Sequence, residues 1–248
     1  MIRTPSSALF FGSGFSKWAA GLPVVNELFD FAIEPWGPRD VQKIEVVRSI
    51  KDIWDKQTLG GHAEQFIGYA MGLAKKERNA VTWYIARRLS EPFIWKEFRS
   101  RWRRHVLLID ENRRFGIEGV VKAQDFINRF LTVNLTGIIT TNYDMLLEYA
   151  LGTKHFNYGR PNQQLSGRGP YPVSTWRNPV RLTGPLPIAK IHGSISWDET
   201  DCYTDGRGAI TGKALIVAPM HEKTPSTILQ FEWDLATKIL DESSSLST

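Results

Sequence analysis

The chain has 248 residues, of which 42% are hydrophobic and 12% aromatic, so it is long and apolar enough for one domain with a substantial core. No run approaches the roughly 18 uninterrupted apolar residues of a membrane span, and the first residues lack the pattern of a signal peptide. We therefore expect a cytoplasmic globular protein with no membrane contact. The single cysteine, Cys202, excludes an internal disulfide and a four-cysteine zinc module.

The net charge of +5 is concentrated in one segment. Residues 85–104 contain seven Arg or Lys residues and two Glu residues, so this stretch alone accounts for the excess of positive charge. One interpretation is the solvated face of an amphipathic helix. The alternative is an electrostatic surface for nucleic acid or for an acidic partner.

The first elements in chain order have the form of a strand, a glycine-rich turn and a helix. SALFF predicts a short strand, GSGFS a turn, and VVNELFDFAI has helical spacing. From about residue 39 to residue 131 the hydrophobic spacing is helical almost throughout. We interpret this stretch as a large all-helical insertion.

Alternating strands and helices resume after the insertion. TGIIT predicts a strand and DMLLEYAL a helix, and a loop rich in Gly and Pro follows at about residues 152–187. PIAKIHGS and ALIVAP are further strands, and the final helix is expected to begin at Thr224, with Pro225 in its first turn. The predicted fold class is a single α/β domain. Its Rossmann-like parallel sheet flanked by helices spans 1–36 and 132–248, and the helical insertion spans about 39–131.

Three polar loops each follow a predicted strand: GSGFS at 12–16, TTNYD at 140–144 and HGS at 192–194. If the strands are parallel neighbours, their carboxyl ends meet at one edge of the sheet, where open α/β sheets bind ligands. We therefore expect the three loops to form one site.

The first loop suits a phosphate. Gly12 and Gly14 let the backbone approach a ligand, and the helix that follows offers free N–H groups. The loop is not a G-x-G-x-x-G motif, because Lys17 occupies the position of the third glycine. The alternative is an ordinary tight turn between a strand and a helix.

The other two loops carry groups for acid–base and ribose chemistry. Asn142 can bond a ribose hydroxyl or hold a water, and Asp144 can stabilise positive charge, although either could instead cap the next helix. Histidine has an unperturbed pKa of about 6.5, so His192 suits proton transfer, with a buried core histidine as the alternative. His62 and Glu64 are interpreted as surface residues of the insertion, and a position of Glu64 facing a nucleotide is the alternative.

The three loops together resemble a known family. GSGFSKWAAGLP is similar to the sirtuin-type opening, in which a G-x-G-x-S loop is followed by Gly-[Ile/Leu]-Pro. TTNYD is similar to the family's T-x-N-x-D, and IHGS is similar to its catalytic H-G. The order also agrees, and the motifs span residues 10–194. The chain therefore resembles a SIR2-like domain, and in particular the bacterial antiphage-defence NADase branch that lacks the zinc module.

The resemblance implies NAD⁺ as the substrate and assigns roles to the loops. Asn142 would position the ribose on the nicotinamide side or the attacking water, and His192 would act as a base on a ribose hydroxyl or on that water. Asp144 would contact a ribose hydroxyl or orient its loop. The implied NAD⁺-binding residues are Gly12, Ser13, Gly14, Phe15, Ser16, Pro23, Thr140, Thr141, Asn142, Asp144, Gly193 and Ser194, with no metal ligand and no zinc.

Two departures from the sirtuin pattern refine the expected activity. The four zinc cysteines are absent, and the family's last strand is expected to be missing because the sequence stops soon after the final helix. The lack of zinc and the large insertion favour an NAD⁺ glycohydrolase that depletes NAD⁺ in antiviral defence. The alternatives are a protein deacylase or ADP-ribosyl transferase, and a catalytically silent NAD-binding sensor module. Expected partners are further copies of the chain or a sensor, such as an Argonaute-type protein, an ATPase or a fused C-terminal domain.

Overall fold

The structure of the chain is a computed structural model. The structure describes residues 6–35, 37–90, 97–99, 105–107, 111–131, 134–152, 154–159, 164–165, 180–181, 184–198, 214–217 and 229–247. Within these ranges, every helix is too short or too polar to cross a bilayer.

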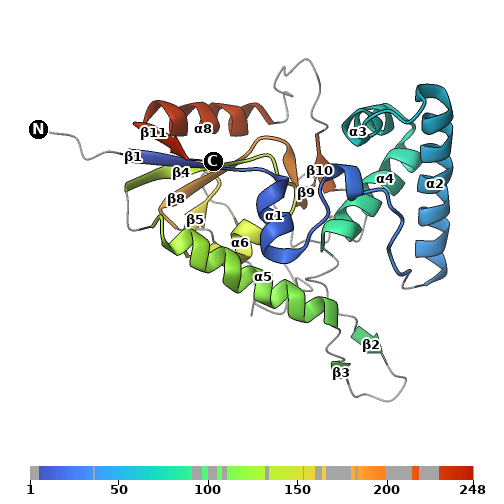
Figure 1. The fold of residues 1–248 in the computed structure, drawn as a ribbon, viewed down its shortest axis with the longest axis horizontal. Helices are drawn as coiled ribbons and strands as arrows, with labels where there is room; N and C mark the ends of the chain where they lie inside the picture. Colours follow the sequence, from blue (N-terminus) through green and yellow to red (C-terminus); the bar gives the residue numbers. More distant parts are fainter. Residues whose placement is uncertain are drawn as a thin grey trace, which may run out of the picture.

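A five-stranded parallel sheet forms the centre of the molecule (Figure 1). Its strands, in spatial order, are β11 (Ser245–Ser247), β1 (Ser6–Phe11), β4 (Asn134–Thr140), β8 (Leu186–Lys190) and β5 (Phe156–Asn157). Every neighbouring pair is parallel. The strand order therefore confirms the predicted Rossmann-like α/β fold.

Helices cover both faces of the sheet, as parallel sheets require. On one face lie α1 (Ser13–Ala20), α5 (Glu111–Asn128) and α6 (Leu146–Leu151), and α5 contacts both of the other helices. On the opposite face α8 (Gln230–Asp241) contacts β4 and β8 (Figure 1). The predicted start of this last helix at Thr224 lies outside the described residues.

Small residues bring α8 close to the sheet. Ala8 and Ala189 pack with Ile239 in a cluster separate from the larger core. A Cβ added to Gly137 of β4 would lie 2.6 Å from the Cδ1 atom of Ile239, so a larger residue there would displace this side chain. Larger side chains, including Phe11 and Ile138, point into the main core on the other face.

A helical lobe stands beyond the carboxyl ends of the strands (Figure 1). We define it as η1 (Val25–Glu27), α2 (Pro38–Thr58), α3 (Ala63–Met71) and α4 (Lys75–Ser90). Pro38 occupies the first helical position of α2, where its missing N–H is not needed. The side chains of Phe66, Val81 and Tyr84 are fully buried and join the lobe to the main core.

The sequence predicted an insertion made only of helices, but the structure also contains two short strands there. The strands β2 (Glu97–Arg99) and β3 (His105–Leu107) pair antiparallel between α4 and α5. A short run of apolar and charged residues fits the period of a helix as well as that of a strand, so hydrophobic spacing alone does not distinguish the two. In addition, α5 covers the sheet beside α1 instead of packing within the lobe.

A strand follows the final helix, where the sequence predicted none. β11 follows α8 directly, and Ser7 and Leu9 of β1 pair with Ser245 and Ser247. This strand is short, polar and at the edge of the sheet, so it lacks the hydrophobic run by which buried strands are found in a sequence.

The remaining strands form two small antiparallel pairs outside the main sheet. PIAKIHGS divides into β8 and β9 (Gly193–Asp198), and β9 pairs with β10 (Ala214–Ile216). The pair β6 (Gln164–Leu165) and β7 (Val180–Arg181) falls in the stretch expected to be a loop. The chain therefore turns at residues 191–192, between the end of β8 in the main sheet and the start of β9 outside it.

Candidate active site

The first loop joins β1 to α1 at the sheet edge. Gly12 precedes the helix with φ of −106°, which any residue can adopt, and Gly14 lies within it. The positive φ occurs later, at Gly21, where φ is 66° and the N–H group bonds the carbonyl of Lys17. The Gly-Leu-Pro sequence thus ends α1 and leads the chain into the lobe.

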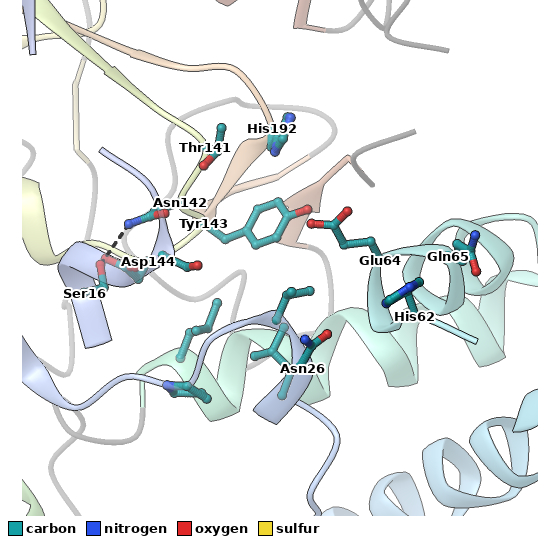
Figure 2. Close-up of a pocket in the computed structure, with 15 residues that line it drawn as sticks. Ser16, Asn26, His62, Glu64, Gln65, Thr141, Asn142, Tyr143, Asp144 and His192 are labelled. Carbon is teal, nitrogen blue, oxygen red and sulfur yellow. Dashed lines mark hydrogen bonds between the residues drawn. The ribbon is translucent and has the colours of Figure 1, made fainter. Parts of the chain in front are cut away.

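A cavity of about 650 Å³ lies between the sheet edge and the lobe (Figure 2). Its volume is in the range of small-molecule sites. Residues from all three predicted loops meet there, together with residues from the lobe. The lining residues are Ser13, Ser16, Pro23, Val25, Asn26, Leu28, His62, Glu64, Gln65, Leu89, Thr141, Asn142, Tyr143, Asp144 and His192.

Asn142 is held in a fixed orientation. Its Nδ2 atom donates to the carbonyl oxygen of Gly12 at 3.0 Å and to Oγ of Ser16 at 2.9 Å. Because a carbonyl can only accept, the amide nitrogen must face Gly12, and Oδ1 must face away. That Oδ1 atom is buried and has no hydrogen-bond partner among the described residues. The site therefore offers one fixed acceptor to a ligand hydroxyl or to a water.

The TTNYD loop is tied to β1. Thr140 donates through Oγ1 to the carbonyl of Phe11 at 2.9 Å, and the same hydroxyl accepts the N–H of Asn142 at 3.0 Å. The backbone N–H of Thr141 also donates to Phe11. Thr140 is fully buried and lies outside the cavity lining, whereas Thr141 contributes to it.

Asp144 bonds the backbone at the start of the next helix and also lines the cavity, whereas its role in stabilising positive charge stays a prediction. Its Oδ1 atom accepts the N–H of Leu146 at 2.9 Å at the start of α6, and the residue also lines the cavity. Burial raises the pKa of this carboxyl above its ordinary value. The charge of Lys190 and the hydrogen bonds from Leu146 and Ser16 act in the opposite direction without reversing the shift.

A buried ion pair next to the TTNYD loop helps to hold it in place. Nζ of Lys190 lies 2.8 Å from Oε1 of Glu148, and both side chains are at most 1% exposed. Lys190 also donates to the backbone carbonyl of Asp144, and the hydroxyl of Tyr158 donates to Glu148 at 2.9 Å. This network connects β8 to the catalytic candidate Asp144.

His192 lies at the turn after β8 and lines the cavity while half-buried. Its ring centroid is 6.3 Å from that of Tyr143, and its backbone carbonyl accepts the N–H of Val217. The next residue, Gly193, has φ of 87°, and a Cβ there would lie 2.2 Å from the carbonyl oxygen of Leu215. The glycine of the HGS loop is therefore required by the backbone path.

Several predicted binding residues do not line the cavity. The hydroxyl of Ser194 is buried and faces Tyr143 and Ser196, and Phe15 packs against Phe11 at a ring-centroid distance of 4.3 Å. Gly193 and Thr140 have the structural roles described above. Gly12 and Gly14 do not line the cavity either. These positions lie near the site without contacting its space.

The lobe contributes residues that the loop motifs did not identify: Asn26, His62, Glu64 and Gln65. His62 and Glu64 are exposed, as predicted, yet they face the cavity (Figure 2). The predicted position of Glu64 facing a nucleotide stays a prediction. Tyr143 was also missed, although it lies inside TTNYD. Among the described residues that line the cavity, Asp144 and Glu64 are carboxylates, and neither Lys nor Arg is present.

The basic segment is only partly described. Arg87 is buried and donates to the backbone of Glu34, and Arg88 pairs with Asp30 at 2.7 Å. These two residues are engaged within the chain. The side chains of the other five basic residues lie outside the described residues, so the interpretation of this segment as a binding surface stays a prediction.

No protein-family model matches this sequence, and no curated protein matches it either.

Proposed function

We propose that this chain is a SIR2-like NAD⁺ glycohydrolase, which releases nicotinamide from NAD⁺. The observation that carries the proposal is the fixed, unpaired Oδ1 atom of Asn142 in a cavity that it shares with His192. A ribose hydroxyl or a water is the donor that this acceptor requires. The sequence resemblance supplies the identity of the substrate, and the meeting of its three motifs at one cavity supports it.

The chemistry follows from how the nicotinamide bond breaks. As the bond lengthens, positive charge develops on the ribose, as in glycoside cleavage. Carboxylates and oriented dipoles stabilise such charge in a site shielded from water. Asp144 and the Asn142 amide oxygen would meet this need, and His192 would accept a proton from a ribose hydroxyl. The pyrophosphate would lie at the amino end of α1, near Ser13, where backbone N–H groups are free.

Depletion of NAD⁺ in antiviral defence is the biological role that we propose for this activity. This part of the proposal rests on the sequence resemblance alone. A sensor partner that switches on the activity would be consistent with it.

Nicotinamide release from NAD⁺ tests the proposal. The purified chain would be compared with Asn142→Ala and His192→Ala, and with matched exposed controls, Asn128→Ala and His155→Ala. We expect release that needs no acetylated peptide, that is lost in the two site variants and that persists in both controls. Release that depends on an acetylated peptide would instead indicate a deacylase. Binding of NAD⁺ by calorimetry without release would indicate a silent sensor module.

A further inference from the structure

Glu64 and Tyr143 face each other across the cavity. Glu64 lies in the first turn of α3 and is exposed, whereas Tyr143 comes from the TTNYD loop and is 9% exposed. Figure 2 shows the phenol oxygen of Tyr143 directed toward the Glu64 carboxylate. Two segments that are 79 positions apart in the sequence therefore form opposite walls of one site.

Both groups present hydrogen-bond acceptors to the space between them. The hydroxyl of Tyr143 donates its only proton to the carbonyl of Val217 at 2.9 Å, so its lone pairs remain for the cavity. The Glu64 carboxylate only accepts. Consistent with this arrangement, burial and the charge of Glu64 both raise the pKa of Tyr143. A species that donates two protons satisfies both acceptors at once.

A water molecule is the smallest such species. We propose that Glu64 and Tyr143 hold the nucleophilic water of the hydrolysis, and that Glu64 is the catalytic base that activates it. This inference rests on the proposed function and refines it. It leaves His192 to act on the ribose hydroxyl, and it explains why the acceptor of the ribosyl group would be water.

The step balances without a further reactant. The bond between C1′ of the ribose and the nicotinamide nitrogen breaks, and its electron pair neutralises the pyridinium ring. The water oxygen forms a bond to C1′, and one water proton passes to Glu64 and then to solvent. The products are ADP-ribose, nicotinamide and one proton.

Glu64→Gln provides the test, because it preserves size and one acceptor oxygen at an exposed position. Glu45→Gln, on the exposed surface of α2, is the matched control. We expect Glu64→Gln to lower kcat for hydrolysis by about 100-fold or more, the usual range for loss of a general base. The Kd for NAD⁺, measured by calorimetry, should stay near that of the unmodified chain, and Glu45→Gln should retain full turnover.

Azide separates a base from a structural residue. Azide attacks carbon without losing a proton, so it needs no base. We expect azide to restore NAD⁺ consumption by Glu64→Gln and to give ADP-ribosyl azide, detectable by mass spectrometry. Azide should not restore Asn142→Ala, because that change removes ribose positioning. Tyr143→Phe removes the second acceptor and should lower hydrolysis about tenfold, the equivalent of one hydrogen bond.

The outcomes distinguish this inference from the function on which it rests. Equal hydrolysis by Glu64→Gln and the unmodified chain would overturn the role of Glu64 alone. A large rise in Kd, or loss of turnover without azide rescue, would also overturn it, because Glu64 would then bind substrate or support the fold. If the unmodified chain releases no nicotinamide, the proposed function fails, and this inference fails with it.

Discussion

Nδ2 of Asn142 lies 2.9 Å from Oγ of Ser16, which joins the loop after β4 to the helix after β1. Ser16 is 2% exposed and Asn142 6%. The same Nδ2 atom bonds the backbone of Gly12, so the first two polar loops form one hydrogen-bonded unit. A substitution in either loop should therefore alter the geometry of the other.

Ser16→Ala tests this coupling. The change removes one of the two acceptors that fix the Asn142 amide, and also the hydrogen bond from Ser16 to Asp144, so we expect a loss of at least about 1 kcal/mol in the free energy of unfolding. If activity depends on that orientation, kcat/KM should fall about fivefold, the rate equivalent of the same energy. Urea denaturation and steady-state kinetics measure the two effects. Ser49→Ala, an exposed change on α2, is the control, and equal values for both variants would contradict the coupling.

Asp144→Asn should stabilise the protein at neutral pH. Burial raises the carboxyl's folded-state pKa above the unfolded value of 3.8, so the folded state binds more protons between these two values. Stability from this group is therefore complete below pH 3.8 and is lost as pH rises through the folded pKa. Asparagine carries no charge and keeps an acceptor for Leu146.

Denaturation of both proteins across pH measures this effect. The variant should unfold at higher urea concentration at pH 7, and its advantage should shrink toward pH 3. A constant difference across the range would show that ionisation of Asp144 is not its cause. Under the proposed function the same variant should lose activity, because residues that serve a functional site often lower the stability of the fold.

The strands at the centre of the fold were predictable because their residues are buried on both faces. GIIT of β4 and PIAK of β8 are continuous apolar runs with clear ends. β11 was missed because the sequence Ser-Leu-Ser at 245–247 is too short and polar to form an apolar run. The helical prediction for 97–99 and 105–107 failed because a three-residue strand is shorter than one helical turn.

The site residues that follow neighbouring strands were predictable from the sequence. The site residues that reach the cavity through packing between distant segments were not. Asn142 and His192 follow parallel neighbouring strands, so their loops had to meet. Glu64 reaches the cavity only because α3 packs against η1 and α4, which no local motif reports. Ser194 was misassigned because the turn at 191–192 points the chain out of the sheet and into β9.

Lys190→Met should destabilise the protein strongly. The change leaves the carboxylate of Glu148, which is 0% exposed, without its counter-charge, and such losses typically amount to about 3–5 kcal/mol. Adding Glu148→Gln should recover part of this loss, because the buried negative charge is then removed. Urea denaturation of the two single variants and the double variant gives the coupling energy.

The exposed pair of Lys238 and Glu242 offers a control for this cycle. Their charged atoms are 3.9 Å apart, and both side chains are more than half exposed. Lys238→Met should change the free energy of unfolding by less than about 1 kcal/mol. A similarly small effect for Lys190→Met would mean that water reaches Glu148.

Gly193→Ala and Gly14→Ala should have opposite effects on stability. At Gly193, φ is 87° and the new Cβ would meet the Leu215 carbonyl at 2.2 Å, so the backbone beside His192 must shift. We expect a loss of about 1–3 kcal/mol. At Gly14 no atom lies within 4 Å of the new Cβ, and the helical backbone suits alanine, so stability should rise by up to about 1 kcal/mol.

The same two variants separate folding from ligand approach. Gly14→Ala places a methyl group beside the amino end of α1, where the proposed function puts the pyrophosphate, so NAD⁺ should bind more weakly although the protein is more stable. Gly193→Ala should reduce both stability and turnover, because His192 moves with the backbone. Calorimetry with NAD⁺ and urea denaturation measure these effects. If a stable Gly14→Ala protein binds NAD⁺ with unchanged affinity, the pyrophosphate does not lie beside α1. The role of Asn142 would then be tested only by the turnover of Asn142→Ala.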